Sequence, residues 1–182
     1  GQIKKAVQLL LEAKRPMIYS GGGVVLSNAA EQLTKLTRLL GYPITNTLMG
    51  LGGYPFSDRQ YLGMPGMHGT FEANMAMHYS DVLLAVGARF DDRATGKVAA
   101  FCPQARIVHI DIDPAELDKI KTAHIGITAD VQEALNRLLP AVATNARSDW
   151  RQRVDSLKAE HPFLMPDVDK PLSHFGLIRT VA

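Results

Sequence analysis

The fold is decided by the stretch Val82-Leu83-Leu84-Ala85-Val86-Gly87-Ala88-Arg89-Phe90-Asp91-Asp92-Arg93. Its uninterrupted apolar start is typical of a central strand in a parallel sheet that helices cover on both faces. A glycine follows at once, and then four charged residues in five positions. Because ligands of such sheets lie at the carboxyl ends of the strands, we expect residues 87–93 to belong to a binding site.

Four further apolar runs alternate with segments of helical periodicity. We expect strands over residues 16–20, 43–47, 107–111 and 123–128, with helices between them. Asn28, followed by Glu31, is expected to cap a helix. Five or six such strand-helix units predict an α/β fold: a doubly wound, mainly parallel six-stranded sheet with helices on both faces, Rossmann-like in architecture.

Composition limits what this fold can do. The chain has 182 residues, of which 46% are hydrophobic and 21% charged, and this suits one core. Its 20 basic and 18 acidic residues are interspersed, which argues against a nucleic-acid partner. No apolar run approaches the roughly 20 residues of a membrane helix. We therefore expect a cytoplasmic protein without a membrane partner.

The cysteines and histidines predict no metal site. Cys102 is the only cysteine, which excludes an internal disulfide and a thiolate metal site, and we expect it to be a small buried residue. His68, His109 and His124 have no spacing that would build a metal site with nearby carboxylates.

Both ends of the chain indicate that it was cut out of a longer protein. It begins at Gly1 without an initiator methionine, and residues 175–182 form an apolar periodic segment without a stop signal. We expect a domain over residues 1–145, followed by a carboxyl-terminal helix and linker over residues 146–182 that lead to a missing domain.

Three loops at expected strand ends, residues 64–70, 87–93 and 109–113, suit one extended ligand, and a dinucleotide has that shape. The first loop precedes a helix start, which favours anions, and its Met67 suits contact with a flat conjugated ring. Core filling is the alternative for Met75 and Met77. Residues 21–23 are three glycines that could approach a pyrophosphate, but they do not continue the G-x-G-x-x-G pattern, and a simple tight turn fits them equally well.

The charges of the second loop suit a phosphorylated ligand. Arg89 and Arg93 can clamp phosphate, while Asp91 and Asp92 can position these arginines or accept hydrogen bonds from a sugar. A solvated charged loop is the alternative.

Three further aspartates are candidates for helix capping or for ligand binding. Asp113 is explained by helix capping, and Asp130 is a cap first and a ligand contact second. Asp111, at a strand tip, has no capping role and could accept hydrogen bonds from a ribose.

Together these motifs resemble the central domain of the acetohydroxyacid synthase (acetolactate synthase) catalytic subunit. The resemblance spans about residues 4–139 and is carried by Leu48-Met49-Gly50-Leu51-Gly52, Gly66-Met67-His68-Gly69-Thr70, Ala73-Asn74, Arg89-Phe90-Asp91-Asp92-Arg93 and Ile107-Val108-His109-Ile110-Asp111-Ile112-Asp113. It implies a three-domain thiamine-diphosphate enzyme of branched-chain amino-acid synthesis whose middle domain binds FAD, a flavin without required redox turnover there. Such an enzyme decarboxylates pyruvate and transfers the two-carbon unit to a second 2-ketoacid.

By position, the resemblance also assigns residues to the cofactor and to the active site. Met67, Asp92 and Arg93 would lie at the mouth of the active site. The residues that would line FAD are Gly22, Gly23, Thr47, Leu48, Met49, Gly66, Met67, His68, Gly87, Arg89, Asp91, Arg93, Asp111, Ile112 and Asp130.

The resemblance places the rest of the machinery outside this chain. The residues that activate thiamine diphosphate and bind Mg belong to the amino- and carboxyl-terminal domains, so we expect no catalytic residue here and no turnover by the chain alone. It implies as partners those two domains, a second catalytic subunit in a homodimer, and a small regulatory subunit.

The residues alone leave a second interpretation open. A nicotinamide-nucleotide-binding module or oxidoreductase domain could use the same kind of sheet. The FAD interpretation requires that Gly66, Arg89 and Asp111 share one side of the molecule.

Overall fold

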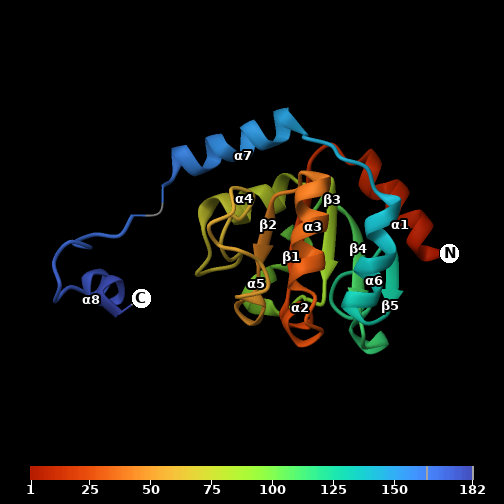
Figure 1. Cartoon of the computed structure of the whole chain (residues 1–182), viewed down its shortest axis with the longest axis horizontal. Coiled ribbons are helices and arrows are strands. Elements are labelled where there is room, and N and C mark those ends of the chain that lie inside the picture. Colours follow the sequence, from red (N-terminus) through yellow and green to blue (C-terminus); the bar gives the residue numbers. More distant parts are fainter. Residues whose placement is uncertain (163, 182) are drawn as a thin grey trace.

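The structure is a computed structural model that describes residues 1–162 and 164–181. Strands and helices alternate along the chain (Figure 1). The strands are β1 (Pro16–Ser20), β2 (Ile44–Asn46), β3 (Val82–Val86), β4 (Arg106–Asp111) and β5 (Ile125–Thr128). The helices are α1 (Gln2–Glu12), α2 (Gly22–Leu26), α3 (Ala30–Leu40), α4 (Phe71–Tyr79), α5 (Asp92–Thr95), α6 (Val131–Leu138), α7 (Ser148–Glu160) and α8 (His174–Val181).

The strands form one sheet in the order β2-β1-β3-β4-β5, and every pairing is parallel. The doubly wound α/β fold is thereby confirmed, with β3 at the centre. The expected sixth strand is wrong for the described residues, which form five. The chain begins with α1 and continues after α6 into α7, and both segments have helical rather than strand periodicity.

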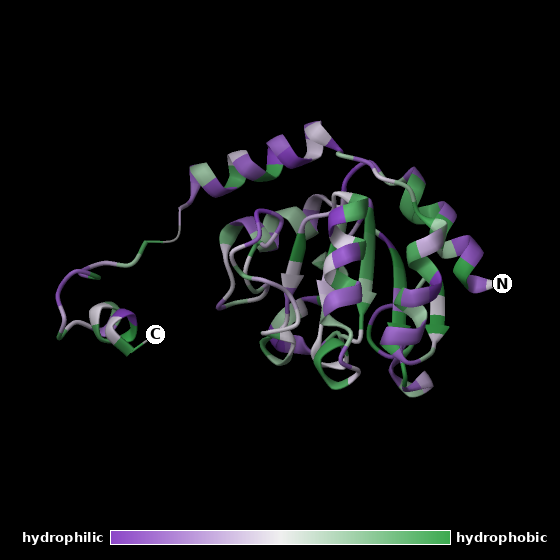
Figure 2. Cartoon of the chain, viewed as in Figure 1, coloured by the Kyte–Doolittle hydropathy of each residue, from purple (hydrophilic) through white to green (hydrophobic). Residues whose placement is uncertain are grey.

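Alternate residues of the strands enter two separate cores. Ile18, Leu84 and Val108 face α1, α3 and α6, whereas Met17, Leu83 and Ile107 face α4 and α7. Figure 2 shows β3 in green, hydrophobic, and purple, hydrophilic segments on α3. Strands that helices cover on both faces are near-continuous apolar runs, and β3, which is buried along its whole length, accordingly has no alternating pattern.

Helix starts agree with the sequence at some places and differ at others. Thr70 and Asp130 cap α4 and α6, because their side chains accept hydrogen bonds from Ala73 N and Glu133 N. Asp113 accepts from Ala115 N, but it starts only a 3₁₀ turn, Pro114–Glu116. The Asn28 cap is wrong: α2 occupies the preceding residues, and Asn28, at φ 53°, turns the chain from α2 into α3.

The carboxyl-terminal segment crosses the amino-terminal ends of the strands. In Figure 1, α7 runs along that end of the sheet, and α8 lies apart from it. Trp150 and Val154 of α7 are buried in the core on the α4 face, and Trp150 Nε1 donates to Pro16 O at 2.8 Å. No helix in the described part of the chain is long and apolar enough to cross a membrane. The division near residue 145 remains a prediction.

Candidate functional site

The loops that follow the five strands meet along the carboxyl ends of the sheet. We call this edge the carboxyl rim, and it comprises residues 21–23, 47–50, 66–68, 87–93, 111–112 and 130. Because all strands are parallel, their carboxyl ends must lie at one edge. Arg89 follows β3 and Asp111 ends the neighbouring β4, and Gly66 packs against the same edge, since a Cβ on Gly66 would meet Arg93 O. Gly66, Arg89 and Asp111 therefore lie on one side of the molecule, as the FAD interpretation requires, and the other residues expected to line FAD belong to the same rim.

Backbone hydrogen bonds join the segments of the rim that follow neighbouring strands. Thr47 N donates to Ser20 O at 2.8 Å, and Gly21 N donates to Val86 O at 3.0 Å. Gly87 N donates to Ile110 O at 2.8 Å, and Ala129 N donates to Asp111 O at 3.0 Å. The chain of bonds therefore crosses every strand end and holds the loops of the rim in a fixed relation to one another.

Glycine is required where the first and third strand loops touch. Gly23 N donates to Gly87 O at 2.9 Å, and a Cβ on Gly23 would stand only 2.7 Å from Gly87 Cα. Gly87 itself has φ 54°, a left-handed conformation that favours glycine. Packing of the two loops therefore requires glycine at both positions. Both glycines remain partly exposed, so backbone without side chains is accessible at the centre of the rim, as close approach of a pyrophosphate needs.

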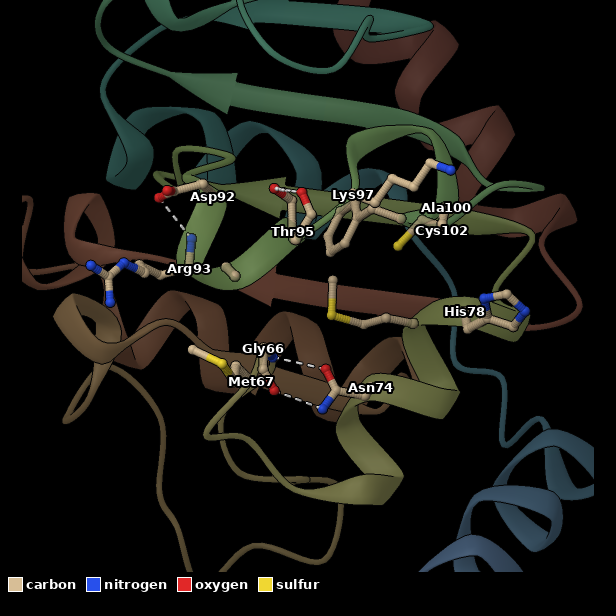
Figure 3. Close-up of a pocket in the computed structure, with 14 residues that line it drawn as sticks. Gly66, Met67, Asn74, His78, Asp92, Arg93, Thr95, Lys97, Ala100 and Cys102 are labelled. Carbon is tan, nitrogen blue, oxygen red and sulfur yellow. Dashed lines mark hydrogen bonds between the residues drawn. The ribbon is translucent and has the colours of Figure 1, made fainter.

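A cavity of about 670 Å³ adjoins one end of the rim, between α4 and α5 (Figure 3). Met67, Asp92 and Arg93, expected at the active-site mouth, all line it. Figure 3 shows Asp92 and Arg93 on one wall and Gly66, Met67 and Asn74 on the opposite wall. The lining residues are Gly66, Met67, Asn74, Met77, His78, Asp92, Arg93, Ala94, Thr95, Gly96, Lys97, Ala100, Phe101 and Cys102.

The remaining expected FAD residues lie on the rim outside this cavity. A larger cavity, about 930 Å³, lies between α1 and α7 at the amino ends of the strands, and none of the expected site residues lines it. Ligands of doubly wound sheets lie at the carboxyl ends, so the smaller cavity is the better candidate.

We call residues 87–93 the charged loop, and its charged side chains form only one weak ion pair with one another. Arg89 Nη2 lies 3.2 Å from Asp91 Oδ2, and both side chains are more than half exposed, so the pair contributes little to stability. The Arg93 guanidinium makes no ion pair with any residue that the structure describes. Both arginines are therefore available to an anionic ligand, as the solvated-loop alternative also allows.

Asp111 has a structural role that the sequence did not indicate. Its Oδ1 accepts a hydrogen bond from Asp113 N at 3.0 Å, and the residue is 8% exposed. This short turn fixes the carboxylate at the tip of β4, while its other oxygen lies 3.9 Å from His109 Nε2. The capping role of Asp130 is confirmed, and its Oδ1 accepts from Glu133 N at 3.1 Å.

The rim also exposes apolar side chains. Met67 is 76% exposed, and Leu48, Met49 and Ile112 are each about 70% exposed (69%, 73% and 68%). Apolar side chains in such number along one edge indicate a surface that a ligand ring or a neighbouring domain covers.

Two features of the cavity were not predicted as part of a site. Asn74, on α4, holds the glycine loop, because its amide accepts from Gly66 N at 2.8 Å and donates to Gly66 O at 2.9 Å (Figure 3). No local sequence pattern pointed to this contact, because it depends on how α4 packs beside the loop. Cys102 lies in the cavity wall and is buried, as expected; burial raises the pKa of its thiol to about 12.

The chain is similar to a known domain family and to known proteins. The family model for the central domain of thiamine pyrophosphate enzymes matches residues 3–138. The large subunit of acetolactate synthase isozyme 1 from Escherichia coli K12 is 46% identical over 180 residues, which are 99% of this chain and 32% of that protein. The acetolactate synthase large subunit of Buchnera aphidicola subsp. Schlechtendalia chinensis is 50% identical over 144 residues, covering 79% of this chain and 25% of that protein.

A third relative shows a similar level of identity. The acetolactate synthase large subunit of Corynebacterium glutamicum is 46% identical over 166 residues, 88% of this chain and 26% of that protein. The chain thus spans about a quarter to a third of the length of these relatives.

Proposed function

Because the chain belongs to the family of thiamine pyrophosphate enzyme central domains, we propose that it is the FAD-binding central domain of an acetolactate synthase large subunit. The observation that carries the proposal is the carboxyl rim: a continuous backbone edge with bare glycine at its centre, arginines at one place and exposed apolar side chains at others. An extended flavin nucleotide requires all three kinds of contact along one line.

The parts of the rim correspond to the parts of FAD. Gly22, Gly23 and Gly87 offer close backbone approach to the pyrophosphate, and Arg89 offers a charge for it. Asp111 offers a fixed carboxylate to a ribose. Met49 and Met67 offer polarizable side chains to the flat ring system.

The proposed lining of FAD is completed by Thr47, Leu48, Gly66, His68, Asp91, Arg93, Ile112 and Asp130. Met67, Asp92 and Arg93, which share the cavity beside α5, are proposed to lie at the mouth of the active site. In that position Arg93 would bind an anionic 2-ketoacid through its guanidinium, which forms no ion pair with the described residues.

The activity of the whole protein is part of the same proposal. We propose that it joins pyruvate to a second 2-ketoacid in branched-chain amino-acid biosynthesis, with thiamine diphosphate supplying the carbanion stabilisation that decarboxylation needs. Thiamine diphosphate and Mg would be held by the neighbouring domains, so this chain alone is not expected to turn over pyruvate. Its proposed partners are those domains, a second catalytic subunit and a small subunit, in the cytoplasm.

Titration with FAD tests the cofactor assignment. FAD fluorescence should be quenched on addition of the chain, and Arg89→Gln should weaken binding about tenfold, the value of one charge-assisted hydrogen bond. Arg137→Gln is a matched control, since Arg137 is similarly exposed, at 66% against 60%, but lies on α6 in a pair with Glu133. Absence of binding at millimolar FAD, or equal affinity of the two variants, would refute the assignment.

The nicotinamide alternative is decided in the same experiment. Saturable binding of NAD without any response to FAD would select a nicotinamide-nucleotide module.

A further inference from the structure

Two buried side chains, neither of them among the expected site residues, contact backbone carbonyls of the charged loop. Tyr19 OH donates to Arg89 O at 3.2 Å, and His109 Nε2 lies 3.0 Å from Ala88 O. Both Tyr19 and His109 are 0% exposed. Two successive carbonyls of the loop are thus directed into the core, where each has a specific partner.

The sheet register explains why these two side chains reach the same loop. Tyr19 on β1 and His109 on β4 both pair with Ala85 on β3, so the three residues form one row on the α4 face of the sheet. Alanine leaves space above the central strand, and Phe90 fills it. The Phe90 ring centroid lies 5.7 Å from that of Tyr19 and 5.1 Å from that of His109.

The protonation states of Tyr19 and His109 suit hydrogen-bond donation. Burial raises the pKa of Tyr19, so its hydroxyl keeps its proton. Burial lowers the pKa of His109 although Asp111, Asp118 and Glu116 act in the opposite direction, so the ring is neutral at neutral pH. A carbonyl can only accept, so the single N–H of the neutral ring must be on Nε2. Nδ1 has no hydrogen-bond partner among the described residues.

With Phe90 buried and the two carbonyls turned inward, the neighbouring side chains must turn outward. Phe90 is 3% exposed, whereas the side chains of Arg89 and Asp91 are 60% and 57% exposed. We infer that Tyr19 and His109 are positioning residues that present Arg89 and Asp91 to the ligand of the carboxyl rim. What that ligand is rests on the proposed function, but the anchoring of the loop does not.

Proteolysis measures the anchoring without any ligand. Trypsin cleaves after Arg89 and Arg93, and native-state cleavage there requires the loop to open. Tyr19→Phe, which removes only the hydroxyl, and His109→Leu should each raise the rate of cleavage at these two bonds about fivefold to tenfold, the effect of one lost hydrogen bond. His109→Gln, whose amide N–H can replace Nε2–H, should remain close to the wild type.

Tyr42→Phe is the matched control for general destabilisation. Tyr42 is also buried, and its hydroxyl donates to Leu10 O at 2.6 Å, in the core on the other face of the sheet. This variant should lower the free energy of unfolding but leave cleavage at Arg89 and Arg93 unchanged. Equal cleavage in wild type and Tyr19→Phe, or faster cleavage in Tyr42→Phe matching that of Tyr19→Phe, would overturn the inference.

Titration of the same variants with FAD tests whether Tyr19 affects ligand binding. If wild type binds FAD, Tyr19→Phe should weaken the affinity severalfold while Tyr42→Phe does not, and equal affinities of these two variants would overturn the positioning role. If wild type fails to bind FAD, the proposed function fails, and the proteolysis result alone decides whether the loop is anchored.

Discussion

Replacement of Arg147 by alanine should destabilise the protein more than any surface substitution. Arg147 is 8% exposed, and its guanidinium binds backbone carbonyls that two helices leave unpaired at their carboxyl ends. Nε donates to Ala13 O at 3.1 Å, Nη2 to Leu10 O at 3.0 Å, and Nη1 to Leu40 O. The same cation lies over the Tyr42 ring, 4.8 Å from its centroid.

The size of the effect follows from these contacts. A hydrogen bond with a charged donor contributes about 1.5 kcal/mol at the low end, and a cation near a helix carboxyl end adds about 0.3–1 kcal/mol for each helix. The three hydrogen bonds and the two helix ends together would stabilise the fold by about 5 kcal/mol. In the variant, water can hydrate the freed carbonyls and recover part of this free energy. We therefore expect Arg147→Ala to lower the free energy of unfolding by about 3–4 kcal/mol.

Urea unfolding followed by circular dichroism measures this loss. Arg137→Ala is the control, because it removes an exposed i,i+4 pair with Glu133 and should cost at most about 0.5 kcal/mol. Burial of Trp150 gives a second signal, since release of α7 would shift the tryptophan emission. If Arg147→Ala cost no more than about 1 kcal/mol, the carbonyls would be adequately solvated without the guanidinium, and the reasoning would be refuted.

Three further predictions concern single groups. Because burial lowers the pKa of His109 below 6.5, the unfolded state binds a proton first as the pH falls, so stability should decrease below about pH 6.5; urea midpoints from pH 7.5 to 5 should show this, and His109→Gln should reduce the dependence. Thr70→Val removes the hydroxyl that accepts from Ala73 N and donates to Leu62 O, and it should lower stability by about 1–2 kcal/mol in thermal unfolding, with no loss indicating that water replaces the cap. Cys102 should react with a thiol reagent only after unfolding, because the thiol is buried and its pKa is raised to about 12; rapid labelling of the native protein would contradict this.

The candidate site was predictable where chemistry depends on residue type and strand position. Gly87 and the charges after it follow an apolar strand, and the general rule for parallel sheets places them at the binding edge. The role of Asn74 could not be predicted, because its contact with Gly66 depends on how α4 packs beside the loop. The Asn28 cap failed because the chain already forms α2 over Gly22–Leu26, and Asn28 takes a left-handed conformation between α2 and α3.

The sequence by itself determined the α/β alternation, the central strand, the capping by Thr70 and Asp130, and the loops that carry glycine and charge. These features depend on residues close together in the chain, whose periodicity and turn chemistry act locally. Only the tertiary structure decided that Tyr19, Ala85 and His109 form one row beneath the charged loop, and that Arg147 joins the ends of α1 and α3. Those contacts require strand order, register and helix packing, which arise from burial of surfaces far apart in the sequence.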